Sequence, residues 1–173
     1  MSRKLNLSLT LRYAIIEAIV FCIPVFIYIR DATYQKTWLL FLGCFFFLIV
    51  SVFHTLEDSR KSAGRERTFT LVFNSHMITI AAIILSCVLS FILLAIMIPG
   101  YLGKGTADTT LADAPPNTIF DKTNGLSFKV FMTAVVGNFI AGSFVGILVP
   151  FYSSRRNRRM SGEEFPLKEK RIP

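Results

Sequence analysis

The sequence predicts an all-α integral membrane protein, a four-helix bundle with both termini in the cytoplasm. Three observations lead to this prediction. Hydrophobic residues make up 53% of the 173 residues and charged residues only 17%, so the mean hydropathy is +0.54. The apolar residues gather in four blocks, each long enough to cross a bilayer as a helix. Basic residues are divided unevenly among the segments that join the blocks, which is the pattern of the positive-inside rule.

The four blocks are expected to be helical because lipid offers the backbone no hydrogen-bond partners, and a helix satisfies its own polar groups. The expected spans are about 13–29, 38–56, 77–98 and 130–151. They form one domain over residues 1–152, followed by a basic cytoplasmic tail, 153–173, that we expect to be disordered. Two alternatives remain for residues 68–74: an interfacial segment or an early start of the third helix.

The first two blocks differ in character. The first follows several basic residues, as a signal peptide does, but it is long for one and lacks a small-x-small cleavage site. We therefore predict an uncleaved helix, with Pro24 removing one backbone hydrogen bond and favouring a kink. The second block is rich in phenylalanine on nearly all sides. This predicts that the second helix is either the most exposed to lipid or the one covered by a large apolar partner.

The connecting segments orient the helices. Fourteen lysine and arginine residues lie in the N-terminal segment, the second connection and the C-terminal tail, against five in the other two connections. This places both termini in the cytoplasm and suggests the inner membrane of a bacterium. Four arginines in the tail predict contact with anionic lipid headgroups, or only a stop-transfer flank: Arg155, Arg156, Arg158 and Arg159.

The fourth block carries the clearest packing pattern. Gly142 and Gly146 have the small-xxx-small spacing that lets helix backbones approach closely in lipid. Two interpretations remain for this face: packing inside the bundle, or docking of other membrane subunits or a second copy. Asn138 lies on the same face and should seek a hydrogen-bond partner across the interface. The complete small-residue face comprises Ala134, Gly137, Asn138, Ala141, Gly142 and Gly146.

Weaker seams of small residues occur on the third and first helices: Thr79, Ala82, Ser86 and Ser90, and Ala14, Ala18 and Cys22. Such positions predict the faces along which these helices contact their neighbours. The three cysteines lie in three different apolar blocks and form no CxxC pair. They are therefore expected to be small apolar residues rather than disulfides.

Three polar residues are expected at one depth, near the cytoplasmic shoulder of the membrane: Glu17, His54 and His76. A carboxylate with two imidazoles could bind a divalent metal or relay protons. The plainer interpretation is that all three reach water or lipid headgroups, and a third alternative is a structural hydrogen bond within the bundle. Because their spacing matches no motif, we predict no metal and no cofactor.

Several features of layout occur together. A basic second connection leads to FTLVFNSHMITI at the start of the third helix, and a longer outer loop follows it. The last helix, VVGNFIAGSFVGILVPF, is glycine-rich and precedes a basic tail. In these features the chain resembles a family of uncharacterised four-span inner-membrane proteins of Bacteroidota. The resemblance implies the four-span fold and no particular activity.

No dinucleotide, P-loop, metalloprotease or hydrolase motif is present in the sequence. Topology explains the positive charge, so we expect no nucleic-acid partner. The sequence therefore predicts a non-enzymatic membrane subunit that scaffolds, stabilises or regulates a larger inner-membrane assembly. The alternative is a small transporter or channel component that uses Glu17 and the kinked first helix.

Overall fold

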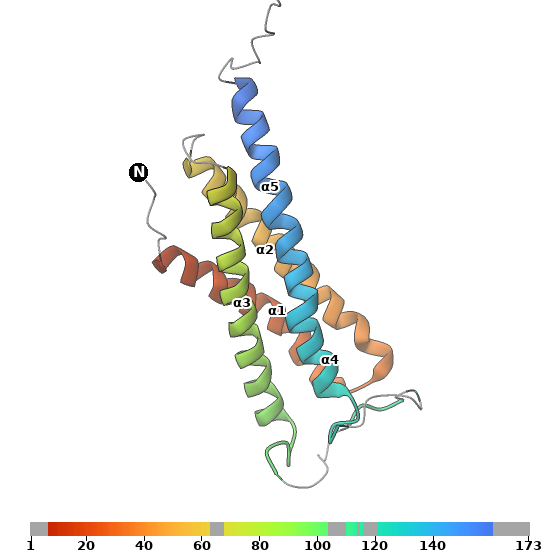
Figure 1. Cartoon of the computed structure of the whole chain (residues 1–173). Helices are drawn as coiled ribbons and strands as arrows, with labels where there is room; N and C mark the ends of the chain where they lie inside the picture. The colour runs from red at the N-terminus through yellow and green to blue at the C-terminus, as the bar shows by residue number, and fades with distance from the viewer. Residues whose placement is uncertain (1–6, 63–67, 104–109, 114, 116–120, 161–173) are drawn as a thin grey trace, which may run out of the picture.

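A computed structural model describes residues 7–62, 68–103, 110–113, 115 and 121–160. The helices are α1 (Leu7–Asp31), the short 3-10 helix η1 (Tyr34–Thr37), α2 (Trp38–Ser62), α3 (Thr68–Met97), α4 (Leu126–Met132), the π-helical segment η2 (Thr133–Gly137) and α5 (Asn138–Met160). The last three follow one another without a break and form one long rod (Figure 1). Since none of the described residues forms a β-strand, the predicted all-α helical bundle is confirmed.

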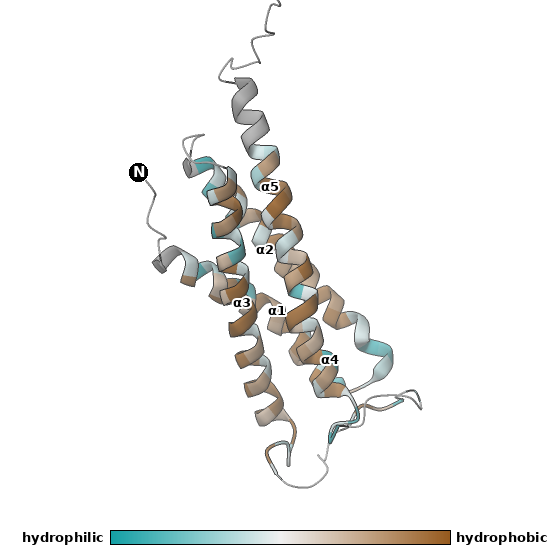
Figure 2. Ribbon diagram, viewed as in Figure 1, coloured by the Kyte–Doolittle hydropathy of each residue, from teal (hydrophilic) through white to brown (hydrophobic). Residues whose placement is uncertain are grey.

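Among the described residues, four helices are long and apolar enough to cross a membrane: Thr10–Asp31, Tyr34–Arg60, Thr68–Met97 and Leu126–Ser153. Hydrophobic residues dominate the middle of each helix, and hydrophilic ones gather toward the ends and the connections (Figure 2). Large apolar side chains are exposed along the outer surface of every span, as lipid contact requires. The chain is therefore a multi-pass membrane protein.

The helices extend beyond the apolar blocks. Helix α3 begins at Thr68, which confirms the early start of the third helix as the correct alternative for residues 68–74. Helix α5 continues to Met160, so the first part of the expected tail is helical rather than disordered. Residues 161–173 lie outside the described residues. Helix ends are set by backbone hydrogen bonding and caps, and apolar composition alone does not mark them.

The four spans form a ring. Helices α1 and α5 lie opposite each other, and each packs against both α2 and α3. Helix α1 crosses the others obliquely (Figure 1). We call the end of the bundle where α1 begins and α5 ends the termini end, and the opposite end, which holds the connection between α3 and α4, the loop end.

The expectation that the second helix is the most exposed to lipid is wrong. In the most apolar part of each span, 39% of α2 is buried, against only 22% of α3. The reason is Gly43, where an added Cβ atom would lie 3.1 Å from the Phe21 ring and from the Phe21 carbonyl oxygen. This close approach of α1 buries one side of α2, including Phe47, and leaves Phe41 and Phe53 facing lipid.

The connection between α3 and α4 folds back onto the turn between α1 and α2. The backbone N–H of Ala112 donates to the carbonyl of Ala32 at 2.7 Å, and the N–H of Tyr34 donates to the carbonyl of Ala112 at 3.0 Å. Asp121 accepts hydrogen bonds from the backbone N–H groups of Thr123 and Gly125 at 2.8 and 2.9 Å, just before α4. These bonds tie the loop end together.

Candidate functional site: a buried carboxylate–imidazole pair

The small-residue face of the last span is covered by the chain's own helices. A Cβ atom added to Gly142 would lie 2.3 Å from the methyl carbon of Thr79, and one added to Gly146 would lie 2.9 Å from the Ser75 hydroxyl oxygen. At Gly137 the same atom would lie 2.6 Å from the Cys44 sulfur. Packing inside the bundle is therefore the correct interpretation, and docking of another subunit on this face is wrong.

The remaining residues of the face are buried as well: Ala134, Asn138 and Ala141. The expectation for the asparagine is wrong, because neither its side-chain oxygen nor its nitrogen has a hydrogen-bond partner. Asn138 follows directly after the π-helical segment η2, whose Thr133 carbonyl lies 3.8 Å from the Cys44 sulfur. The Asn138 amide is thus fully buried at the start of α5 with neither of its polar atoms satisfied.

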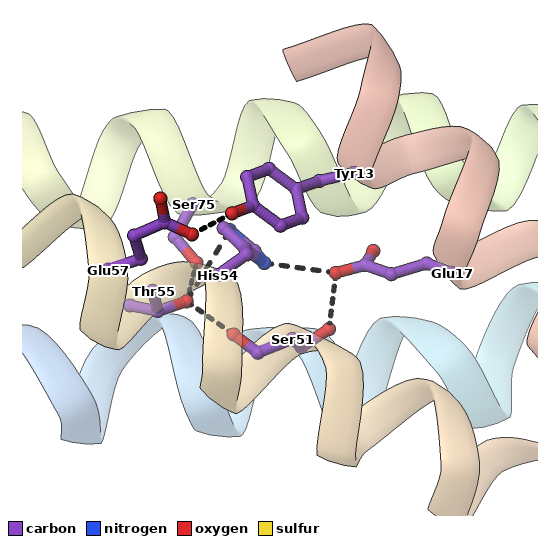
Figure 3. Close-up of polar contacts among 7 residues, drawn as sticks. All are labelled: Tyr13, Glu17, Ser51, His54, Thr55, Glu57 and Ser75. Carbon is purple, nitrogen blue, oxygen red and sulfur yellow. Dashed lines mark hydrogen bonds and ion pairs between the residues drawn. The ribbon is translucent and has the colours of Figure 1, made fainter. Parts of the chain in front are cut away.

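Glu17 and His54 form a buried pair inside the membrane span. Glu17 is 0% exposed and His54 2% exposed. The Nδ1 atom of His54 lies 3.0 Å from Oε1 of Glu17, and the hydroxyl of Ser51 donates to the same oxygen at 2.9 Å (Figure 3). Glu17 lies seven residues beyond Thr10, where the span begins, or about 10 Å along the helix axis. The interpretation that these two residues reach water or headgroups is wrong.

The other carboxylate oxygen of Glu17 behaves differently. It is fully buried and has no hydrogen-bond partner, and Figure 3 shows it pointing away from Ser51 and His54. A buried carboxylate without its full set of partners is costly in an apolar medium. The pair is therefore a chemically unusual feature of this bundle and the leading candidate site.

A row of hydroxyl groups continues from the pair toward α3. The Thr55 hydroxyl donates to the Ser51 carbonyl at 2.7 Å, and its oxygen lies 3.4 Å from Nε2 of His54. The Ser75 hydroxyl lies 3.3 Å from the same Thr55 oxygen. Because the Thr55 hydrogen is used by the Ser51 carbonyl, Ser75 is the donor in this last contact. Both nitrogen atoms of His54 thus have oxygen neighbours.

Tyr13 covers the pair on the side of the termini end. Its ring centroid lies 5.4 Å from that of His54, and its hydroxyl donates to the carboxylate of Glu57 on α2. This contact links α1 to α2 one helical turn beyond His54. Figure 3 shows the tyrosine ring beside the imidazole, with its hydroxyl directed to the Glu57 carboxylate.

His76 does not join the pair. Its Nδ1 atom lies 2.8 Å from the Val72 carbonyl of the preceding turn, and its ring packs against Gly146. Within the described residues, no group of three histidine, cysteine, aspartate or glutamate side chains could hold a metal ion. The structure thus brings together two of the three residues that the sequence placed at one depth.

Several members of the site were not predicted from the sequence: Tyr13, Ser51, Thr55, Glu57 and Ser75. One signal for them was present. Ser51, His54 and Thr55 follow the i, i+3, i+4 spacing of one helical face, and they interrupt an otherwise phenylalanine-rich span. A polar stripe of that kind marks the face that points away from lipid.

The predicted lipid contacts of the basic tail fall on residues whose side chains lie outside the described part of the chain: Arg155, Arg156, Arg158 and Arg159. Their backbone belongs to α5.

Comparison of the chain with protein-family models, curated proteins and solved structures found no match. The resemblance to the Bacteroidota family therefore stays a prediction.

Proposed function

We propose that this chain is the proton-binding component of a small membrane transporter or channel, with Glu17 and His54 as the proton site. One observation carries the proposal: a carboxylate and an imidazole lie in direct contact, fully buried among four membrane-spanning helices. Ionisable residues within membrane spans are rare and usually belong to ion or proton pathways. The proposal takes the protein to be non-enzymatic.

The chemistry of the pair suits a proton. The neutral acid with neutral imidazole and the carboxylate with imidazolium differ only in the position of one proton across the 3.0 Å contact. In the carboxylate–imidazolium form the imidazolium has no lone pair for a metal cation, and Oε1 of Glu17 accepts from both Ser51 and His54.

The scaffold hypothesis has lost the observation on which it rested, because the small-residue face is covered within the chain. The transporter or channel alternative is now supported by an observation, because Glu17 is buried and paired with His54. For the setting we keep the topology expected from the basic residues: both termini in the cytoplasm, in a bacterial inner membrane, with the tail arginines on anionic headgroups.

The proposal can be tested with purified protein in liposomes. A potassium diffusion potential is imposed, and proton entry is followed with a trapped pH-sensitive dye. We expect the wild type to carry protons. In Glu17→Gln the proton flux should be reduced at least about tenfold, because the amide cannot release a proton. His76→Gln is the matched control and should match the wild type. Wild-type flux equal to that of empty liposomes would overturn the proposal.

A second measurement looks at the site itself. Infrared difference spectra between acid and neutral pH should show one carboxyl band that disappears in Glu17→Gln. This readout does not depend on net transport. If the spectra of the wild type and of Glu17→Gln are identical, the buried carboxylate does not exchange protons and cannot be the proton site.

A further inference from the structure

Several buried polar groups without a hydrogen-bond partner come from α1 and α3, two helices that pack against each other. Ser86 and Ser90 on α3 are 0% exposed, and neither hydroxyl oxygen has a partner. The hydroxyl of Tyr28 on α1 is also buried without a partner. These groups lie on the loop-end side of the helices, whereas the network around Thr55 and Ser75 lies on the side of the termini end.

Neighbouring side chains connect these groups. The Cys22 thiol of α1 lies beside the Ser90 hydroxyl without reaching hydrogen-bond geometry. Likewise, the Tyr28 hydroxyl lies beside that of Thr37. The Thr37 hydroxyl in turn accepts from the Lys129 ammonium at 3.5 Å, at the loop end of the bundle.

The length of this seam fits a route to Glu17. Cys22 and Tyr28 follow Glu17 on the same helix by five and eleven residues, or about 7.5 and 16 Å along the axis. Ser86 precedes Ser90 by one helical turn, about 6 Å nearer the termini end of α3. Helix α1 packs against both α2 and α3. Ser51 and His54 contact Oε1 of Glu17 from α2, and its buried Oε2 has no hydrogen-bond partner and points away from both (Figure 3).

We propose that the α1/α3 seam, formed by Ser86, Ser90, Cys22 and Tyr28, is a hydrated proton route from the loop end to the free carboxylate oxygen of Glu17. This inference rests on the proposed function and extends it. With the Thr55–Ser75 network on the other side of the pair, it makes the protein a pathway that crosses the membrane rather than a site open to one face.

The seam supplies what an internal water molecule needs. Buried waters usually make two to four hydrogen bonds to polar groups that lack other partners, and the hydroxyls of Ser86, Ser90 and Tyr28 are such groups. A proton moves along such a row by transfer between hydrogen-bonded oxygens, so each oxygen gives up one proton as it gains another. It reaches Oε2 of Glu17. The shared proton then stays on Nδ1 of His54, and the proton on Nε2 passes to the Thr55 oxygen. For this step the Thr55 hydroxyl turns its own hydrogen from the Ser51 carbonyl to the Ser75 oxygen and passes that proton on.

The titratable side chains along the seam are few. Cys22 and Tyr28 come from α1 and Cys87 from α3, while His54 faces Glu17 from α2. None of these four side chains is permanently charged; the Lys129 ammonium, which contacts Thr37, is the fixed positive charge at the loop end of the seam.

The test compares two variants in the liposome assay. Ser86→Ala/Ser90→Ala removes two seam hydroxyls and leaves the pair intact. Ser143→Ala is the matched control, because its hydroxyl is also buried without a partner but lies on α5. We expect proton flux to fall about fivefold for each seam hydroxyl, as the loss of one hydrogen bond implies, and to be unchanged in the control.

The outcomes separate this inference from the proposed function. Normal flux in Ser86→Ala/Ser90→Ala, together with lost flux in Glu17→Gln, overturns the seam and leaves the proton site standing. A wild type without flux overturns the proposed function itself. Equal losses in the seam variant and in Ser143→Ala would show a general packing effect and would also overturn the seam.

A second measurement addresses the seam without net transport. In a Cys44→Ala/Cys87→Ala background the only thiol is Cys22, and its isolated S–H infrared band reports exchange with deuterated water. We expect Cys22 to exchange at least about tenfold faster than Cys44 in the matched Cys22→Ala/Cys87→Ala protein, because a hydrated seam gives it water partners. Slower or equal exchange of Cys22 would rule out a hydrated seam even if the variants folded poorly.

Discussion

Replacing Gly142 by alanine should destabilise the bundle although the change adds a single methyl group. The new Cβ atom would lie 2.3 Å from the methyl carbon of Thr79 and 2.6 Å from its hydroxyl oxygen. Both atoms belong to a short, β-branched side chain that is restricted to two χ1 rotamers in a helix, and its Cβ atom would itself lie 3.0 Å from the new Cβ atom of residue 142. Thr79 cannot swing aside, so α3 and α5 must separate locally.

The magnitude follows from the cost of overpacking. Inserting a methyl group into a filled core usually costs about 1–3 kcal/mol. Thr79→Ala removes both clashing atoms. Alone, it should cost less than about 1 kcal/mol, because its hydroxyl makes no hydrogen bond and lipid already solvates apolar side chains well. The double variant should therefore be close to the wild type, with a coupling energy of about 1–2 kcal/mol.

The assay is reversible unfolding in mixed micelles with increasing denaturing detergent, followed by far-UV circular dichroism. The wild type, both single variants and the double variant complete the cycle. Ile140→Leu, at an exposed position on the same helix, is the control and should unfold with the wild type. A neutral Gly142→Ala, or a double variant no more stable than Gly142→Ala, would refute the reasoning that Thr79 covers this glycine.

Two further predictions concern the ends of the bundle. Burial would raise the pKa of Asp121, but hydrogen bonds from Gly125 and Thr123, just before α4, outweigh it and lower the pKa below 3.8. The stability that this carboxylate contributes is therefore complete above pH 3.8. It is lost as the pH falls through the lowered pKa. Asp121→Asn should abolish this acid-dependent loosening, measured by amide hydrogen exchange at Thr123, and an unchanged acid profile would contradict it. For topology, a reporter active only outside the cytoplasm should be active when fused after Gly103 and silent after Ala63, and activity after Ala63 would overturn the proposed orientation.

The sequence was sufficient for the spans and for the inward faces of three helices. Apolar blocks of this length allow one conformation in lipid, and small residues at helical spacing mark the side on which backbones approach each other. That is why Gly142, Gly146, Ala82 and Ser86 all lie inside. Helix ends were less well predicted, since polar residues continue a helix as readily as apolar ones once it has begun.

The environment of α2 and of Glu17 depends on contacts that no local pattern encodes. Phenylalanines on all sides of a helix do not indicate which side faces the bundle. In α2 that side is the one with Gly43, which contacts the ring of Phe21, a residue far from it in sequence. Likewise, Glu17 and His54 are 37 residues apart in sequence. Residue counting fixed the approximate depth of each, but whether they met depended on the rotation of α1 against α2.

The buried pair is difficult to explain by stability alone. A buried ion pair contributes little net stability compared with apolar residues of the same volume, and its replacement often stabilises a protein. The free oxygen of Glu17 adds a further desolvation cost. The small residues suggest why the pair is present despite this unfavourable free energy. Because Gly146 has no side chain, α5 leaves room for Ser75 on α3, and Ser75 in turn reaches Thr55 beside His54. Close packing thus brings hydroxyl groups to an acid–base pair that apolar packing would have excluded, and this arrangement suits proton exchange better than it suits the holding together of four helices.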